Sequence, residues 1–192
     1  RNGIRIEQTA FVPVDDNCEI HRIKVTNTSG GSKNINLFSF VEFCLWNAQD
    51  DMLNYQRNLN TGEVEIDGNT IYHKTEYRER RNHYAFYSVN TQISGFDTDR
   101  DTFLGAFNGL DNPDSVINGS SGNSVASGWY PIASHRIDIS LNAGESCEYI
   151  FVLGYIENEN DEKFESLNVI NKTKAKKMIA RYESSAQCDA EL

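Results

Sequence analysis

The sequence predicts a mainly β protein, an antiparallel β-sandwich followed by α-helices. From Gly3 to Ile156, apolar residues mostly recur at every second position, which is the period of a strand with one buried face. Clusters of Gly, Asn, Asp and Ser separate these runs, as turns separate the short strands of a sandwich. In the tail the apolar spacing changes to three and four, the period of an amphipathic helix. We therefore predict a β domain over residues 1–157 and a helical segment over residues 158–192.

The strands follow from this alternation in chain order. The first two are predicted at Ile4–Glu7 and His21–Val25, on either side of the turn residues Asp15–Asn17. A second turn cluster occupies Asn27–Ser32. The later runs of the same kind lie at 35–45, 64–66, 71–77, 83–89, 137–141 and 149–155.

Two of these runs are apolar on both faces. In the run 37–46 the second face carries Phe38 and Phe40, and in 149–156 it carries Ile150 and Val152. A strand of this kind has to be covered on both sides. Since a two-sheet sandwich covers only the inner face, we expect the outer face to meet another sheet, a helix or another domain.

The tail has the pattern of a helix. Its apolar residues at positions i, i+3, i+4 and i+7 are Ala175, Met178, Ile179 and Tyr182. The spacing of Phe164, Leu167 and Ile170 predicts a shorter helix before it. The lysines are interpreted as its solvated face: Lys172, Lys174, Lys176 and Lys177.

Composition excludes some classes of partner. The 192 residues carry a formal net charge of −10 with an isoelectric point near 4.8, so neither nucleic acid nor an anionic membrane surface is an expected partner. No apolar run approaches the roughly 18 residues of a membrane span.

The cysteines are scattered without a CxxC motif, which predicts reduced, buried thiols in a cytoplasmic protein: Cys18, Cys44, Cys147 and Cys188.

No metal site or catalytic motif is predicted. The run Asp97–Asp101 begins like a calcium loop, but Thr102 and Asn108 stand where the loop needs Gly and Glu, and Phe103 favours the start of a helix instead. The four histidines are far apart and form no ligand pair, so each is expected to be half-buried and hydrogen-bonded.

The segment Leu45–Asn58 is the most informative for function. It leaves a strand that is apolar on both faces and is dense in amides, carboxylates and an aromatic residue, with Arg57 as its one arginine. Amide and guanidinium groups can form paired hydrogen bonds with the neighbouring hydroxyls of a sugar, and an aromatic ring can pack against its C–H surface. Residue types alone favour an ordinary polar connection in which Asp50 or Asp51 caps a helix.

Five blocks of the sequence resemble the N-terminal part of the cellobiose phosphorylases of glycoside hydrolase family 94. The resemblance covers essentially the whole chain and includes the motif Tyr55-Gln56-Arg57-Asn58. The blocks are Leu37–Ala48, Asn54–Asn58, Tyr72–Arg81, Gly95–Asp101 and Ser124–Ile132.

The resemblance implies a fold and a reaction. The fold is an antiparallel super-sandwich, incomplete at its N-terminus because the family's early strands would precede Arg1, with linker helices leading to an α/α-barrel catalytic domain. The enzymes are homodimers that cleave cellobiose with inorganic phosphate, giving α-glucose 1-phosphate and glucose with inversion. Phosphate replaces the attacking water of an inverting glycosidase, so one carboxylic acid suffices and no cofactor is needed.

The resemblance also implies which residues act. The catalytic acid belongs to the barrel, so no catalytic residue is expected in this chain, and Asp50, Asp51 and Asp99 are not assigned that role. The expected substrate-binding residues are Gln56 and Arg57, which in the family contact the acceptor sugar in the partner subunit's active site.

Several alternatives stay open from the sequence. The chain alone is expected to be inactive, with a role in dimerisation, in support of the barrel and in the acceptor subsite. A non-catalytic carbohydrate-binding sandwich is one alternative, and a purely architectural domain is another. Within the enzyme class, the alternative is a related phosphorylase acting on chitobiose or laminaribiose, because donor specificity belongs to the barrel.

Overall fold

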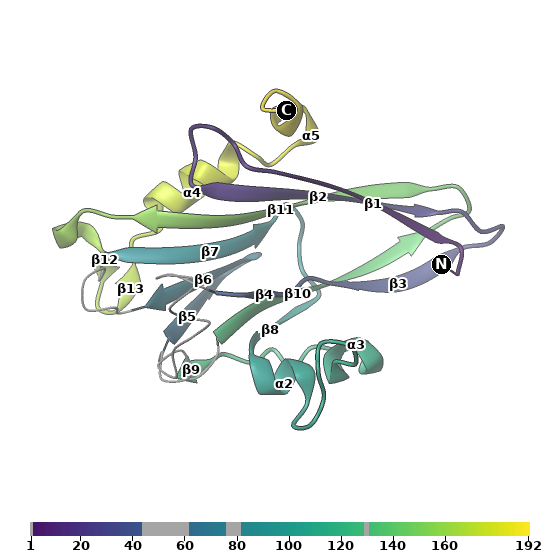
Figure 1. The fold of residues 1–192 in the computed structure, drawn as a ribbon, viewed down its shortest axis with the longest axis horizontal. Coiled ribbons are helices and arrows are strands. Elements are labelled where there is room, and N and C mark those ends of the chain that lie inside the picture. Colours follow the sequence, from purple (N-terminus) through teal and green to yellow (C-terminus); the bar gives the residue numbers. More distant parts are fainter. Residues whose placement is uncertain (1, 44–61, 76–81, 129–130) are drawn as a thin grey trace.

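The computed structural model describes residues 2–43, 62–75, 82–128 and 131–192, and the chain forms a sandwich of two antiparallel sheets. Helices lie on the outer side of each sheet, so that four layers follow one another from top to bottom in Figure 1. This architecture confirms the predicted fold class.

The larger sheet has seven strands in the order β1-β2-β11-β7-β6-β5-β9, and every neighbouring pair is antiparallel. In chain order they are β1 (Ile4–Phe11), β2 (Cys18–Asn27), β5 (Gly62–Asp67), β6 (Thr70–Thr75), β7 (His83–Val89), β9 (Ser127–Gly128) and β11 (Ser146–Glu157).

The smaller sheet is built around β10 (Pro131–Leu141), which pairs with β3 (Lys33–Phe38), β4 (Val41–Glu42) and β8 (Gly95–Asp99). The predicted run 35–45 is thus divided into β3 and β4. Ser39 lies at the division, where its N–H donates to the carbonyl of His135 at 3.0 Å and its hydroxyl accepts the His135 N–H at 2.9 Å.

The main core fills the space between the two sheets. Its buried members from the larger sheet include Val25, Tyr87, Val89 and Phe151, and those from the smaller sheet lie on β10: Ala133, Ile137, Ile139 and Leu141. They alternate along each strand with residues of the opposite face, as the sequence pattern requires.

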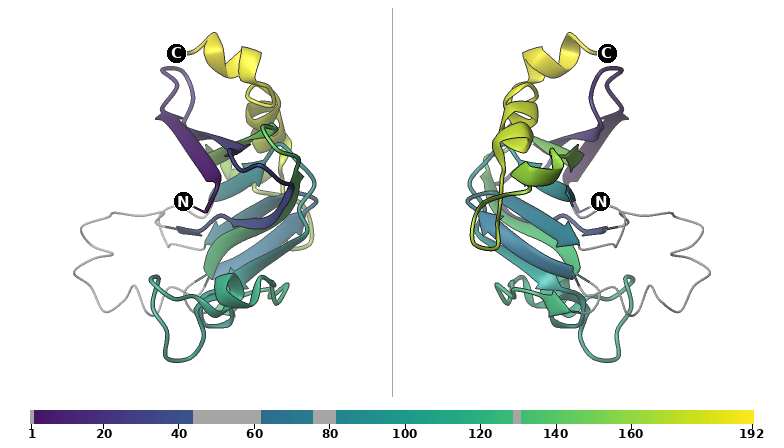
Figure 2. Two further views of the ribbon diagram at one scale, coloured as in Figure 1. Left: turned by 90° about the vertical axis from the view of Figure 1, so that its right-hand side faces the viewer. Right: turned by 90° about the vertical axis from the view of Figure 1, so that its left-hand side faces the viewer.

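A second core lies on the outer face of the larger sheet, beneath α4 (Thr173–Ala180) and α5 (Ser185–Asp189). Figure 2 shows these yellow helices along the outer side of that sheet. Ile150 and Val152 of β11 contribute to this core, together with Met178 and Tyr182 of the tail. The prediction that run 149–156 is covered on both faces is confirmed.

The outer face of the smaller sheet is covered by α2 (Arg100–Leu104), which is followed by α3 (Asp114–Asn118). The Phe103 ring lies 6.4 Å from the ring of Phe38 and 5.2 Å from that of Phe40. The described part of run 37–46 is therefore covered on its second face as well.

The acidic run before α2 starts the helix, as predicted. The Asp99 carboxylate accepts the N–H of Thr102 at 2.7 Å and caps α2. Asp97 is fully buried and accepts hydrogen bonds from the Gly122 N–H at 3.0 Å and the Ser124 hydroxyl at 2.8 Å. Asp97, which lies on β8, thereby holds the loop that contains Gly122 and Ser124 against this strand.

The tail departs from the prediction between Phe164 and Ile170. In place of a helix it forms a hairpin of β12 (Phe164–Ser166) and β13 (Val169–Ile170), preceded by a 3-10 turn at Asn160–Glu162. Asn168 closes the hairpin at a φ of 59°, a conformation that asparagine tolerates better than most residues.

The prediction that the tail lysines form a solvated face is wrong for Lys172, which is only 8% exposed. Its ammonium lies 2.7 Å from the carboxylate of Glu65 on β5, which also accepts from Lys74 at 3.1 Å and from the Ile170 N–H at 3.0 Å. Burial alone would raise the pKa of Glu65, but these hydrogen bonds lower it overall. The network ties the tail to the edge of the larger sheet.

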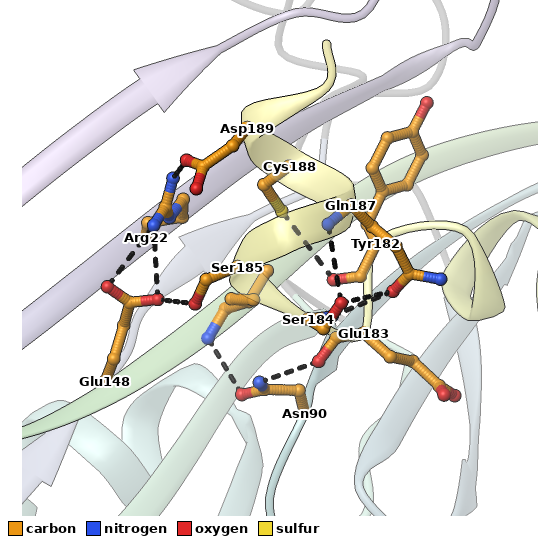
Figure 3. A network of polar contacts seen from close by, with 11 residues as sticks. Arg22, Asn90, Glu148, Tyr182, Glu183, Ser184, Ser185, Gln187, Cys188 and Asp189 are labelled. Carbon is orange, nitrogen blue, oxygen red and sulfur yellow. Dashed lines mark hydrogen bonds and ion pairs between the residues drawn. The ribbon is translucent and has the colours of Figure 1, made fainter. Parts of the chain in front are cut away.

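A further polar network, drawn in Figure 3, fixes α5 to the sheet. Arg22 of β2 pairs with Asp189 of α5 and with Glu148 of β11, and Glu148 also accepts from the hydroxyl of Ser185. Ser184 and Gln187 form a reciprocal capping box at the start of α5. Side chains of both strands therefore hold this helix in place.

The described cysteines carry free thiols: Cys18 and Cys188 are buried, and Cys147 is half-buried. Burial, followed by the nearby Asp16, raises the pKa of Cys18 to about 12. The fourth cysteine, Cys44, lies outside the described residues. No helix in the described part of the chain has the length and apolar character needed to cross a membrane.

Two buried histidines make the fold sensitive to acid. Burial lowers the pKa of His135, which lies between the sheets, to about 3, and that of His73 on β6 to about 4. Because the unfolded chain takes up these protons near pH 6.5 and the folded chain does not, stability is fully present above about pH 6.5 and falls with pH below it.

We expect each of these histidines to contribute about 1.4 kcal/mol per pH unit to this slope. The variant His135→Asn keeps a polar atom beside the Ser39 hydroxyl, 3.2 Å from Nδ1, but cannot take up the proton. Urea unfolding at several pH values should show a shallower slope for this variant, with His21→Asn, a change at a half-exposed histidine, as the control. Equal slopes for His135→Asn and the unmodified chain would contradict the prediction.

Candidate functional site

The predicted sugar-contact residues, Gln56 and Arg57, lie outside the described residues, as do Asp50 and Asp51. Their segment, 44–61, is flanked by Phe43 and Gly62, and these two residues lie at the same end of the sandwich. Gly62 begins β5, where it is paired with Thr75 on one side and Gly128 on the other. On the smaller sheet, Glu42 beside Phe43 is paired with Ile132, near the start of β10.

Both flanks pack against one side chain, His73. Its ring stacks on that of Phe43, with 4.9 Å between the ring centroids and 25° between the planes. Gly62 approaches it so closely that a Cβ at this position would lie 2.3 Å from His73 Nε2 and 2.8 Å from Cγ of Pro131. The absence of a side chain at Gly62 is therefore a condition of this packing.

His73 acts here as a neutral packing group. It is 6% exposed, its Nδ1 has no hydrogen-bond partner within the described part of the chain, and burial lowers its pKa to about 4. At neutral pH the ring carries no charge, so it positions the two flanks without exchanging protons.

A hollow of about 570 Å³ opens beside Phe43 at this end, between the two sheets and the β1–β2 turn. Carboxylates and aromatic rings share its lining. Asp16 pairs with Arg181, and Glu42 pairs with Arg100 at 2.8 Å. The remaining lining includes Asn17, Glu19, Leu153 and Tyr155. Such a mixture of carboxylate, amide and aromatic groups can hold hydroxyl groups and apolar C–H surface together.

The arrangement provides binding groups, and no metal centre is found among them. Within residues 2–43, 62–75, 82–128 and 131–192, no three His, Cys, Asp or Glu side chains are placed to hold a metal ion. Asp99, which the sequence did not support as an acid catalyst, is used in capping α2.

The role of His73 was not predicted. Because His73 lies two residues after Ile71, both side chains were expected on the same face of a strand, which indicated partial burial. The sequence offered no sign that the His73 ring contacts both Phe43 and Gly62. The expectation of a half-buried histidine is wrong for His73, because the residue lies inside the packed end of the sandwich and is only 6% exposed. A glycine at the start of a strand is the one local hint of a close approach.

Comparison with known proteins gives consistent matches. A family model described as "Glycosyl hydrolase 94, supersandwich domain" matches residues 1–185. The chain is 31% identical over 162 residues to an N,N'-diacetylchitobiose phosphorylase of Vibrio proteolyticus, a match that covers 80% of this chain and 19% of that protein.

Two further relatives have similar names. The chain is 25% identical over 191 residues to an N,N'-diacetylchitobiose phosphorylase of Vibrio furnissii, covering 98% of this chain and 22% of that protein. It is 27% identical over 149 residues to a solabiose phosphorylase of Paenibacillus borealis, a match that covers 77% of this chain and 19% of that protein. The chain thus spans about a fifth of the length of these relatives.

The packing at this end predicts the effect of Gly62→Ala. Because the added Cβ would overlap the His73 ring, we expect the variant to lose about 1–3 kcal/mol of unfolding free energy, measured by urea denaturation. Gly30→Ala is the matched control, since a Cβ there would meet nothing within 4 Å. Equal stability of the two variants would show that the close approach at Gly62 is not required.

Proposed function

Because the chain belongs to the supersandwich-domain family of glycosyl hydrolase 94, we propose that it is the N-terminal part of a disaccharide phosphorylase. The family match over residues 1–185 is the observation that carries this proposal. The names of the three relatives, each a phosphorylase of a disaccharide, support it. The activity belongs to the complete protein, of which this chain would form the sandwich.

The proposed reaction is a reversible phosphorolysis with inversion. Inorganic phosphate is the nucleophile and a co-substrate, so the reaction needs no general base and no cofactor. One carboxylic acid protonates the oxygen of the leaving sugar, and we place this acid in the α/α barrel. This chain alone would then be inactive.

We assign Gln56 and Arg57 to the acceptor sugar. A guanidinium presents several N–H donors in a fixed plane, and an amide offers both a donor and an acceptor, which together suit the hydroxyls of a pyranose. The packing of Phe43 and Gly62 against His73 supports this assignment, because both flanks of segment 44–61 start from a rigid part of the sandwich.

The substrate proposed from the sequence blocks is cellobiose, giving α-glucose 1-phosphate and glucose. The relatives are named for N,N'-diacetylchitobiose and solabiose, so chitobiose is supported equally well, and laminaribiose stays within the same class. The remaining proposals are a cytoplasmic location, a homodimer, and contact between this sandwich and the barrel of the same enzyme.

The complete gene product containing this chain should release a sugar 1-phosphate from one of these disaccharides only when inorganic phosphate is present. The measurement is a phosphate-dependence assay over cellobiose, N,N'-diacetylchitobiose, laminaribiose and solabiose. The 192-residue chain, assayed in parallel, should release none. Hydrolysis without phosphate, or no reaction with any disaccharide, would refute the proposed function.

Arg57→Ala in the complete gene product should raise the acceptor KM about ten- to a hundredfold, the effect of losing a charge-assisted hydrogen bond worth about 1.5–3 kcal/mol. The KM for inorganic phosphate, measured in the phosphorolytic direction, should be nearly unchanged, because Arg57 is assigned to the acceptor alone. The measurement is the synthetic reaction with varied acceptor. Arg5→Ala, which alters an exposed arginine on β1, is the control, and equal losses for both substrates would indicate a structural role for Arg57.

A further inference from the structure

A second hollow, of about 490 Å³, lies at the β5–β9 edge of the larger sheet. One wall is formed by the ends of β5, β6 and β9, and the other by the β12–β13 hairpin that replaces the predicted helix. The residues with polar or aromatic side chains that line it are Glu63, Lys74, Ser127, Lys163, Phe164 and Asn168. We call this hollow the hairpin cleft.

The two walls of the hairpin cleft are held at a fixed spacing. The ammonium of Lys74 on β6 donates to the backbone carbonyl of Asn168 at 2.6 Å, across the cleft floor. Glu65 on β5 accepts the N–H of Ile170 on β13 at 3.0 Å. A cleft whose walls are bridged in this way is formed before any ligand arrives, which lowers the entropy cost of binding.

The charges of the cleft argue against an anionic ligand. The three protons of Lys74 are engaged by the Asn168 carbonyl, by Glu63 at 3.1 Å and by Glu65 at 3.1 Å. Lys163 is 5% exposed, with its ammonium 4.9 Å from the centre of the Phe164 ring. Both lysines line the cleft, but Lys74 is fully paired and Lys163 is nearly buried, whereas 64% of the Glu63 side chain is exposed.

The groups that remain accessible match a neutral polyhydroxy ligand. Phe164 lines the cleft and is 38% exposed, with the Lys163 ammonium 4.9 Å from the centre of its ring. An aromatic face packs well against the C–H surface of a pyranose. An amide, a hydroxyl and a carboxylate around it can bond the equatorial hydroxyls as donors and acceptors.

We propose that the hairpin cleft is a binding site for a neutral saccharide, one or two pyranose units long. Phe164 stacks on the sugar ring, while Asn168 and Glu63 bond its hydroxyls. The contacts proposed here do not include the assigned acceptor residues Gln56 and Arg57. It would hold a sugar on the outside of the sandwich, whether or not the complete protein carries out phosphorolysis.

The test is a titration of the ¹⁵N-labelled 192-residue chain with cellobiose and with N,N'-diacetylchitobiose, followed by NMR. We expect saturable shifts of the amides of Ser127, Gly128 and Asn168. Phe164→Ala should weaken binding about tenfold or more, a change of about 1.4 kcal/mol, and Phe107→Ala, at a fully exposed phenylalanine outside the cleft, should leave it unchanged.

Two further variants separate this site from the proposed enzyme function. Asn168→Gly removes the amide at a positive φ that glycine adopts freely, so it should weaken binding while the hairpin remains. Arg57→Ala should leave the titration unchanged, because the acceptor residues take no part in it. Loss of binding in Arg57→Ala would overturn the proposal by moving the sugar to the acceptor residues.

Three other outcomes would also overturn it. These are the absence of saturable shifts with either sugar, equal binding by Phe164→Ala and Phe107→Ala, and shifts of the same amides produced by inorganic phosphate with an affinity equal to that for the sugars. The last result would assign the cleft to anions. A folding control by circular dichroism accompanies each variant, so that a loss of binding is read only from folded chains.

Discussion

The structure depends on one constraint, the burial of β11 on both of its faces. Phe151 faces the smaller sheet and lies 5.6 Å from the ring of Tyr87, while Ile150 and Val152 face the tail helices. Burying a side chain of this size contributes about 1.5–3 kcal/mol, so neither face can be left open to water without a large loss. The second sheet and the tail helices are therefore both required, and the tail is part of the packed structure, with Met178 inside the outer core.

The same constraint explains why one end of the sandwich can carry a site. Two strands that reach this end carry core residues on both faces, Ile71 and Tyr72 on β6 and Ile132 and Ala133 on β10, so their ends are fixed. His73 fills the end from within, and it contacts Phe43 from the smaller sheet and Gly62 from the larger one. A segment that leaves one sheet and enters the other is thereby given two rigid points of attachment. Positioning of binding groups is more reliable when they start from such elements.

The sequence predicted the features that depend on local periodicity and missed those that depend on distant partners. Alternation gave the strands, and the doubly apolar run containing Ile150 indicated the helical cover. The spacing of Phe164 and Leu167 fits a helix, but Leu167 is 91% exposed, and the positive φ of Asn168 closes a hairpin instead. Lys172 is buried because it pairs with Glu65 on β5, more than 100 residues earlier in the chain. A pattern of neighbouring residues cannot predict such a pair. Arg57 could be proposed from its residue type together with the family resemblance, whereas the contacts of His73 depend on distant partners and could not be predicted.

The titratable groups indicate what the sandwich contributes to a reaction. A general acid or base works best when its pKa lies near the working pH. Among the described residues, each resolved shift moves the pKa further from neutrality: burial lowers that of His73 to about 4, and burial, helped by Asp16, raises that of Cys18 to about 12. Burial also raises the pKa of Tyr84, and hydrogen bonds to Glu65 and Glu63 outweigh burial to raise that of Lys74. Groups held in one protonation state can orient a sugar and exclude water but are poorly suited to exchange protons with it. This supports the proposed division, in which the sandwich binds and positions a sugar while a carboxylic acid elsewhere in the complete protein protonates the leaving sugar.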